Sequence, residues 1–127
     1  MQALTAYRSM WSDYTKAAAT SDAKSSALDD HAKGGALKLM KYGLEQAKKD
    51  KVVTKGAPRL SPRAISATRD RVVIQDCVDT TNWLVYKVNG ALKNDVPGSH
   101  RAADATVRRA GGVWKVSDFH VADAGSC

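Results

Sequence analysis

The sequence predicts an α+β fold in which N-terminal helices pack on an antiparallel sheet. In the first 51 residues, apolar side chains recur every three or four positions, which is typical of amphipathic helices. Beyond residue 64 the pattern changes to short runs of β-branched and aromatic residues separated by turn signals. Helices that precede strands favour segregated layers over alternating units with a parallel sheet.

The first 51 residues are expected to be helical. A helix over about residues 4–18 is indicated by an apolar stripe that advances in steps of three and four. Its members are Leu4, Tyr7, Trp11, Tyr14 and Ala18. Gly34-Gly35 then separates a short helix, over about 26–33, from a longer one over about 35–50. One face of the longer helix carries Ala36, Leu39, Met40, Gly43 and Ala47.

The remaining residues are expected to form a linker and then the sheet. Glycine and proline at Gly56, Pro58 and Pro62 indicate that residues 52–64 are an extended linker. Strands are predicted over about 65–78, 83–89, 101–110 and 113–121. The pair Gly111-Gly112 predicts a hairpin turn between the last two strands. We therefore expect a single domain over residues 1–127, helical over 1–51 and β-sheet over 65–127.

The composition is that of an ordinary globular domain. Of its 127 residues 43% are hydrophobic, which excludes a disordered chain, and no apolar run approaches the ~20 residues of a membrane-spanning helix. The net charge of +7 could attract nucleic acid. Base-stacking proteins interleave aromatic with basic residues, whereas the aromatic residues here follow core periodicity. We therefore expect no nucleic-acid partner and keep a basic module for nucleic acid or anionic surfaces as an alternative.

The two cysteines, Cys77 and Cys127, bear on the compartment. They lack CxxC or zinc-ligand spacing, so we expect no metal site. A cysteine at a frayed terminus is best explained by a bond to another, which predicts a Cys77–Cys127 disulfide. Two unrelated free thiols, or a terminal residue added in cloning, are the alternatives. A disulfide would indicate an oxidising compartment, hence a secreted or cell-surface protein.

The start of the chain, Met1-Gln2-Ala3, has no basic segment followed by an apolar one. For an exported protein, this indicates a mature segment without its signal peptide or lipid anchor. Membrane contact is then expected only through that removed N-terminal segment.

Several short strings, taken in order, resemble a known fold family. They are Tyr7/Trp11/Tyr14, Leu28, Gly35-Ala36-Leu37, Gly56-Ala57-Pro58, Asp76-Cys77-Val78-Asp79, Asn82-Trp83, Gly111-Gly112-Val113-Trp114-Lys115-Val116 and Gly125-Ser126-Cys127. Together they resemble the NTF2-like (SnoaL-type, cystatin-like) superfamily, and more narrowly the small exported proteins and lipoproteins of actinobacteria. The resemblance implies that the sheet is curved and forms a cone with the helices. Such cones serve as enzymes, small-ligand cups or interaction domains, so the fold does not fix the function.

An enzyme of this kind needs an acid–base set inside the cone. Members that resemble ketosteroid isomerase and scytalone dehydratase place a base and a donor there. The candidate bases are Asp118, His120 and Asp104, and the candidate donors are Tyr7 and Tyr14.

Side chains alternate between the two faces of a strand, which predicts the residues that share a face with the candidate bases. Asp118 and His120 are expected on the same strand face as Trp114 and Val116, with Phe119 on the other face. Which face lines the cone is left open by the sequence. Exposure at the strand end, or an ion pair with a nearby arginine, is the competing interpretation of both residues.

Aromatic residues are the expected ligand contacts within the cone. The candidates are Tyr7, Trp11, Tyr14 and Trp114, and the helical spacing of the first three is equally that of core residues. Asp76 and Asp79 flank Cys77, and we expect them to make turn hydrogen bonds with Thr80, Thr81 or Asn82. They lack the further oxygen ligands that calcium requires, so no metal or other cofactor is predicted.

The leading expectation is therefore an exported, non-enzymatic domain that binds a partner protein or a small ligand at the cell envelope through its cone. The alternative enzyme is an isomerase of the SnoaL kind that uses Asp118 or His120 with a tyrosine. A homodimer formed through the sheet face is also kept open.

Overall fold

A computed structural model describes residues 1–93 and 95–127 of the chain. Its helices are α1 (Gln2–Ala18), α2 (Leu28–His31) and α3 (Gly34–Lys49). Its strands are β1 (Val52–Gly56), β2 (Arg63–Ala67), β3 (Arg71–Asp79), β4 (Trp83–Lys87), β5 (His100–Ala110) and β6 (Val113–Val121). Helices first and antiparallel strands afterwards confirm the predicted α+β class.

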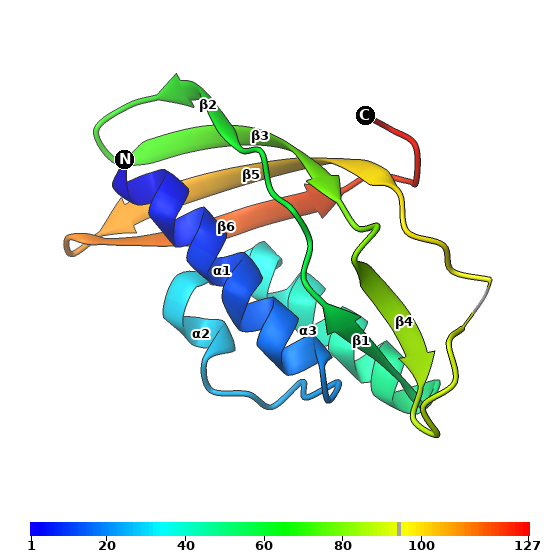
Figure 1. Cartoon of the computed structure of the whole chain (residues 1–127). Helices are drawn as coiled ribbons and strands as arrows, with labels where there is room; N and C mark the ends of the chain where they lie inside the picture. Colours follow the sequence, from blue (N-terminus) through cyan, green and yellow to red (C-terminus); the bar gives the residue numbers. More distant parts are fainter. Residues whose placement is uncertain (94) are drawn as a thin grey trace.

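The strands form two sheets. The larger one has the order β2-β3-β5-β6 and is antiparallel throughout, and the smaller one pairs β1 with β4. All three helices lie on one side of the larger sheet, and the β1–β4 pair stands at the end of the molecule where α3 ends (Figure 1). We call the face of the larger sheet that the helices cover the inner face (Figure 1). We call the face of the larger sheet turned away from the helices the outer face.

The core lies between the helices and the inner face. The helices contribute Ala3, Ala6, Tyr7, Met10, Trp11, Leu28, Ala36, Met40 and Leu44, and the strands contribute Val72, Ile74, Val78, Ala103, Ala105, Val107 and Val116, all buried. Burying a large apolar side chain stabilises by about 1.5–3 kcal/mol. In α3 the buried stripe is Ala36, Met40 and Leu44, so the predicted face was partly wrong, and Leu39 is 42% exposed.

Residues 52–64 were wrongly predicted to be a linker throughout. Val52–Gly56 forms β1, in register with Lys87–Trp83 of β4. Its partner is about thirty residues away in sequence, and its half-buried residues show no alternation that marks a strand. The pairing across the smaller sheet therefore decides this segment.

The predicted strand over 65–78 is two strands. A turn at Thr68–Asp70 separates β2 from β3, and the backbone N–H of Thr68 donates to the carbonyl of Arg71 at 2.7 Å. Asp70 also accepts from the Arg109 guanidinium at 2.9 Å. The turn contains no glycine or proline, so its sequence lacks the strongest turn signals.

The predicted hairpin at Gly111-Gly112 is confirmed between β5 and β6. Gly111 has φ +57° and Gly112 has φ +77°. Positive φ at both central residues is the geometry of the tight hairpin turn that matches strand twist, and glycine adopts it without steric cost.

The predicted disulfide between Cys77 and Cys127 is confirmed, with a Cα–Cα distance of 5.8 Å. After β6 the chain turns back over β5: the N–H of Gly125 donates to the carbonyl of His100, and Ser126 Oγ accepts from the N–H of Ala102, both at 2.8 Å. The bridge thus holds the C-terminal segment against the outer face.

Within the described part of the chain, no helix combines the length and apolar character that crossing a membrane requires.

Candidate functional site

A cavity of about 430 Å³ opens between α1, α3, β4 and the ends of β5 and β6. Its wall is formed by Trp11, Tyr14, Leu39, Met40, Tyr42, Gly43, Thr54, Val78, Thr80, Trp83, Val85, Val96, Pro97, Arg101, Phe119, His120 and Val121. The volume falls within the range of small-molecule sites, roughly 300–1,000 Å³, and the lining is mostly apolar as such sites require. We call it the cone cavity.

Aromatic rings form the inner part of this wall. Trp11 lies edge-on to Trp83 at 5.6 Å between ring centroids and to Phe119 at 5.4 Å. Tyr14 meets Trp83 in the same way at 5.8 Å. Edge-to-face pairs add about 0.5–1.5 kcal/mol each beyond burial, so the wall is built of mutually supporting rings.

A glycine in α3 makes room for one of these rings. A Cβ at Gly43 would lie 2.9 Å from the Tyr14 hydroxyl oxygen. Glycine inside a helix costs about 1 kcal/mol relative to alanine. At this position the missing side chain lets the phenol of Tyr14 lie against α3 at the cavity wall.

The structure places the expected ligand contacts in different locations. Trp11 and Tyr14 line the cone cavity. Tyr7 is fully buried in the core beside Asp76, away from the wall. Trp114 pairs with Arg109 near the hairpin, where the guanidinium carbon lies 5.9 Å from its ring centroid.

A β-bulge at Ser117 explains where the candidate bases lie. The register runs Val107↔Val116 and then Thr106↔Asp118, so Ser117 has no partner. The alternation of inner and outer side chains therefore shifts by one residue after the bulge. Val116 before it is buried on the inner face, and Phe119 after it also lies on the inner face, where it contacts Trp11. The expectation that Asp118 shares a face with Trp114 and Val116 was wrong.

Asp118 and His120 are consequently exposed and turned to the outer face, together with Asp104. The three residues border a shallow depression on that face. His120 also lines the cone cavity, at the edge strand β6. Among the described residues, no His, Cys, Asp and Glu are grouped so as to hold a metal ion.

Asp76 has a role that the sequence did not reveal. It faces inward from the middle of β3, and its Oδ2 accepts a hydrogen bond from the Tyr7 hydroxyl at 2.8 Å. Its Oδ1 accepts from the backbone N–H of Ser61 at 2.6 Å. The expected turn hydrogen bonds are made only by Asp79, which accepts from Thr81 at 2.7 Å. Asp76 instead joins α1, β3 and the segment before β2.

The buried Tyr7 and the half-buried Tyr14 make the fold sensitive to alkali. Burial, reinforced by the negative charge of Asp76, raises the pKa of Tyr7 far above its ordinary value of 10.0, and burial also raises the pKa of Tyr14. In the unfolded chain both would ionise near pH 10, so the stability they hold is complete below that pH and is lost as pH rises toward the folded pKa.

We expect the free energy of unfolding to fall above pH 10, by up to about 1.4 kcal/mol per pH unit from Tyr7, with a further contribution from Tyr14. Urea unfolding between pH 9 and 11 measures the slope. Tyr7→Phe should remove one tyrosine's share, while Tyr42→Phe, at an exposed position, should leave the slope unchanged. Equal slopes in both variants would contradict this linkage.

Arg101 is a cavity residue that sequence reasoning missed. It occupies an inward position of β5, in line with Ala103, Ala105 and Val107. Its Nη1 donates to the carbonyl of Ala122 at 3.2 Å. The sequence does indicate this position, because Arg101 is spaced by two residues from a series of apolar ones on the same strand. A charged residue in such a series lies on the inner face, in the interior or at a cavity.

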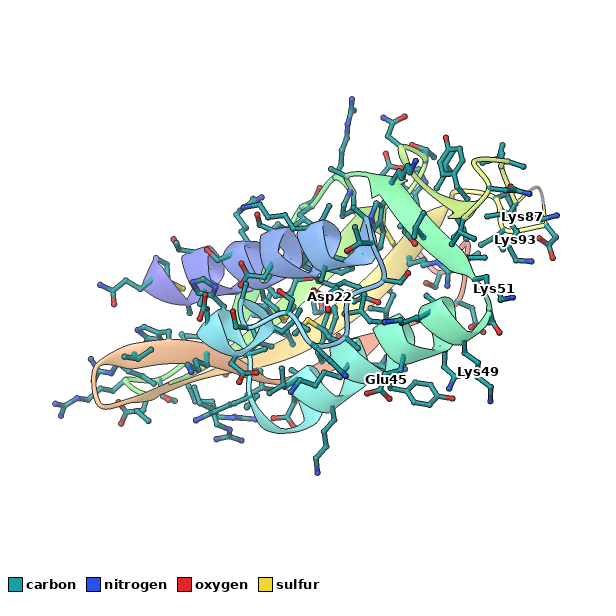
Figure 2. The ribbon with its side chains drawn as sticks, turned by 90° about the horizontal axis from the view of Figure 1, so that it is seen from below. Asp22, Glu45, Lys49, Lys51, Lys87 and Lys93 are labelled. Carbon is teal, nitrogen blue, oxygen red and sulfur yellow. A yellow bond between two sulfur atoms is a disulfide. The ribbon has the colours of Figure 1, made fainter. Side chains whose placement is uncertain are left out.

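Positive charge gathers at one end of the molecule. Figure 2 shows Lys49, Lys51, Lys87 and Lys93 where α3 ends beside the β1–β4 pair. The carbonyl of Lys51 accepts a hydrogen bond from the N–H of Val88, the residue after β4. Lys93 forms an ion pair with Asp95 at 3.0 Å. These lysines are surface groups, but their end of the molecule also supplies part of the cavity wall, including Thr54 and Val85.

Comparisons with known proteins show which solved structures share this architecture. No protein-family model matches the chain, and no curated protein matches it. Solved structures do match. The intermembrane space region of the chloroplast protein ARC6 is 15% identical, with a TM-score of 0.63 and 98% of each chain covered.

Two bacterial structures identify the fold as cystatin-like and NTF2-like. An uncharacterised protein with a cystatin-like fold from Caulobacter vibrioides is 11% identical, with a TM-score of 0.59, over 99% of this chain and 92% of its own. An NTF2-like protein of unknown function from Pseudomonas putida is 15% identical, with a TM-score of 0.50, over 93% and 84%. Such low identities show the fold alone, and the narrower likeness to actinobacterial proteins stays a prediction. The protein has the NTF2-like, cystatin-like fold.

Proposed function

We propose that this protein is an exported domain that binds a small, largely apolar ligand in the cone cavity. The observation that carries the proposal is the cavity itself: about 430 Å³, walled by Trp11, Tyr14, Trp83 and Phe119, and open at one side. An apolar ligand that enters such a site buries its surface against preformed rings, which is the main source of affinity for small molecules.

The positions of the acid–base candidates favour binding over catalysis. A general base must come within hydrogen-bond reach of the proton it removes. Asp118 and Asp104 face away from the cavity, whereas His120 lines it together with Tyr14. The isomerase-like alternative therefore lacks the carboxylate Asp118 and depends on His120 as its base.

The disulfide supports export. Disulfides such as Cys77–Cys127 persist in oxidising compartments and are rare where thiols are kept reduced. A small-ligand binding domain at the cell envelope combines both features.

Nile red, an uncharged dye whose fluorescence rises in apolar surroundings, tests the proposed site. We expect Val85→Trp, which places an indole in the cavity, to weaken dye binding about tenfold or more because the ring occupies the ligand's space. Val88→Trp is the matched control, because Val88 follows β4 closely but is 65% exposed and outside the cavity wall. Fluorescence titration measures both.

The control should bind the dye like the unmodified protein. Equal affinity in all three proteins would mean that the dye adsorbs elsewhere on the surface. Absence of saturable binding to the unmodified protein would likewise overturn the proposed function.

A further inference from the structure

We propose that the ligand of the cone cavity carries an anionic group, such as a carboxylate on an apolar body, and that Arg101 binds it. This inference rests on the proposed function and specifies the chemical class of the ligand. It follows from which charged groups line the cavity, what they are bonded to, and where the remaining positive charge lies.

Among the residues that the structure describes, Arg101 is the only arginine or lysine of the cavity wall, and the wall contains no aspartate or glutamate; His120 is its one other basic side chain. Its guanidinium donates one hydrogen bond, to the carbonyl of Ala122, and forms no ion pair with any of residues 1–93 and 95–127. A guanidinium has five N–H donors, so donors are left for a ligand.

A cation beside aromatic walls is costly without an anion. Partly burying a charge weakens its hydration, and arginine in such places usually pairs with a carboxylate or phosphate, often through two parallel hydrogen bonds. Elsewhere in the chain an arginine does form an ion pair with a carboxylate: Arg109 Nη2 lies 2.9 Å from Asp70 Oδ1. Arg101 has no such partner within the described part of the chain, which leaves the ligand to supply one.

The positive surface charge near the cavity also favours an anionic ligand. Lys49, Lys51 and Lys87 lie at the end of the molecule that contributes Thr54 and Val85 to the wall (Figure 2). The lysines outnumber the acidic Glu45 and Asp50 beside them, and a net positive charge near a cleft raises the local concentration of anionic ligands and their rate of association. A ligand with an anionic head and an apolar body suits both these lysines and the aromatic interior.

Two probes that differ in charge but hardly in shape test the inference: naphthalene-2-carboxylate and naphthalene-2-carboxamide, measured by isothermal titration calorimetry at pH 7. We expect the carboxylate to bind the unmodified protein about tenfold more tightly than the amide, because charge-assisted bonds to a guanidinium are stronger than neutral ones. Arg101→Met should reduce that ratio to near one and leave amide binding within about twofold. Arg101→Lys should retain part of the preference.

Arg108→Met is the matched control. Arg108 is exposed on the outer face of the same strand, so its loss changes the net charge equally but leaves the cavity intact. This variant should keep the full preference for the carboxylate. Equal losses in Arg101→Met and Arg108→Met would show that overall charge, and not Arg101, attracts the anion, which would overturn the inference.

The remaining outcomes separate this inference from the proposed function. If the amide and Nile red bind but the carboxylate gains nothing, the inference fails and the cavity still binds apolar ligands. If no neutral probe binds in a saturable way, both proposals fail.

Discussion

Replacing both cysteines, in Cys77→Ala/Cys127→Ala, should lower the free energy of unfolding by about 4 kcal/mol. The bridge closes a loop across a sequence separation of 50 residues, and the loss of loop-closure entropy in the unfolded chain accounts for that amount in the chain-entropy model. Small domains have stabilities of about 5–15 kcal/mol, so the variant would be close to marginal. Urea denaturation measures the change.

The dependence of stability on urea gives a second readout. The unbridged unfolded chain is more expanded, so the slope of unfolding free energy against urea should rise along with the fall in midpoint. The unmodified protein with its disulfide reduced is the control and should behave like the double variant. A change below about 1 kcal/mol in both would mean that the bridge does not constrain the unfolded state.

Native-state effects of the bridge are expected to be local. The last residues are exposed and are otherwise held by the bonds of Gly125 to His100 and of Ser126 to Ala102. Loss of the bridge should therefore free this segment, while the cone cavity, on the other face of the sheet, keeps its aromatic wall.

The fold class was predictable because it depends on local patterns. The stripe of α1 and the glycine pair before β6 each specify an element through its own residues. β1 was not predictable in this way, because its strand character comes from pairing with β4 far along the chain. The turn before β3 was equally hard to predict, because it is made by Thr68 and Asp70, without glycine or proline.

The candidate site was less accessible to sequence reasoning for two physical reasons. One unpaired residue, Ser117, reverses which face the following side chains take, and alternation alone cannot show a bulge. The cone cavity is also assembled from segments far apart in sequence, so Trp11, Trp83 and Arg101 become neighbours only in the fold. The disulfide was predictable because a cysteine at a frayed terminus gains a structural role only by bonding to another cysteine.

The prediction that Asp76 makes turn hydrogen bonds was wrong because it depended on neighbours in sequence. The actual setting of this carboxylate follows from register: an inward position in β3, opposite Ala103 of β5, turns it toward α1. There it accepts from both Tyr7 and Ser61, one donor on each oxygen. A carboxylate can accept at both oxygens, and this is the property on which the second large effect depends.

Asp76→Asn should cost about 3 kcal/mol of unfolding free energy although it preserves size and shape. An amide has one accepting oxygen. If that oxygen accepts from the Ser61 N–H, the NH₂ group can donate to the Tyr7 hydroxyl oxygen, but the proton of that buried hydroxyl then loses its acceptor. Tyr7→Phe should cost less, about 1–2 kcal/mol, because the carboxylate keeps its bond to Ser61. Chemical denaturation of each variant measures these losses.

The double variant Asp76→Asn/Tyr7→Phe decides whether the two groups act as a pair. With the phenol hydroxyl removed, the amide can turn its oxygen to Ser61 without facing a second donor there. The double variant should therefore lose about 1 kcal/mol less than the sum of the single losses. Strict additivity would show that Asp76 stabilises the fold independently of Tyr7. Asp79→Asn is a matched exchange on the same strand, at a carboxylate bonded to the exposed Thr81, and we expect it to cost much less than Asp76→Asn. A comparable loss of stability in Asp79→Asn would assign the effect to charge and not to the buried pair.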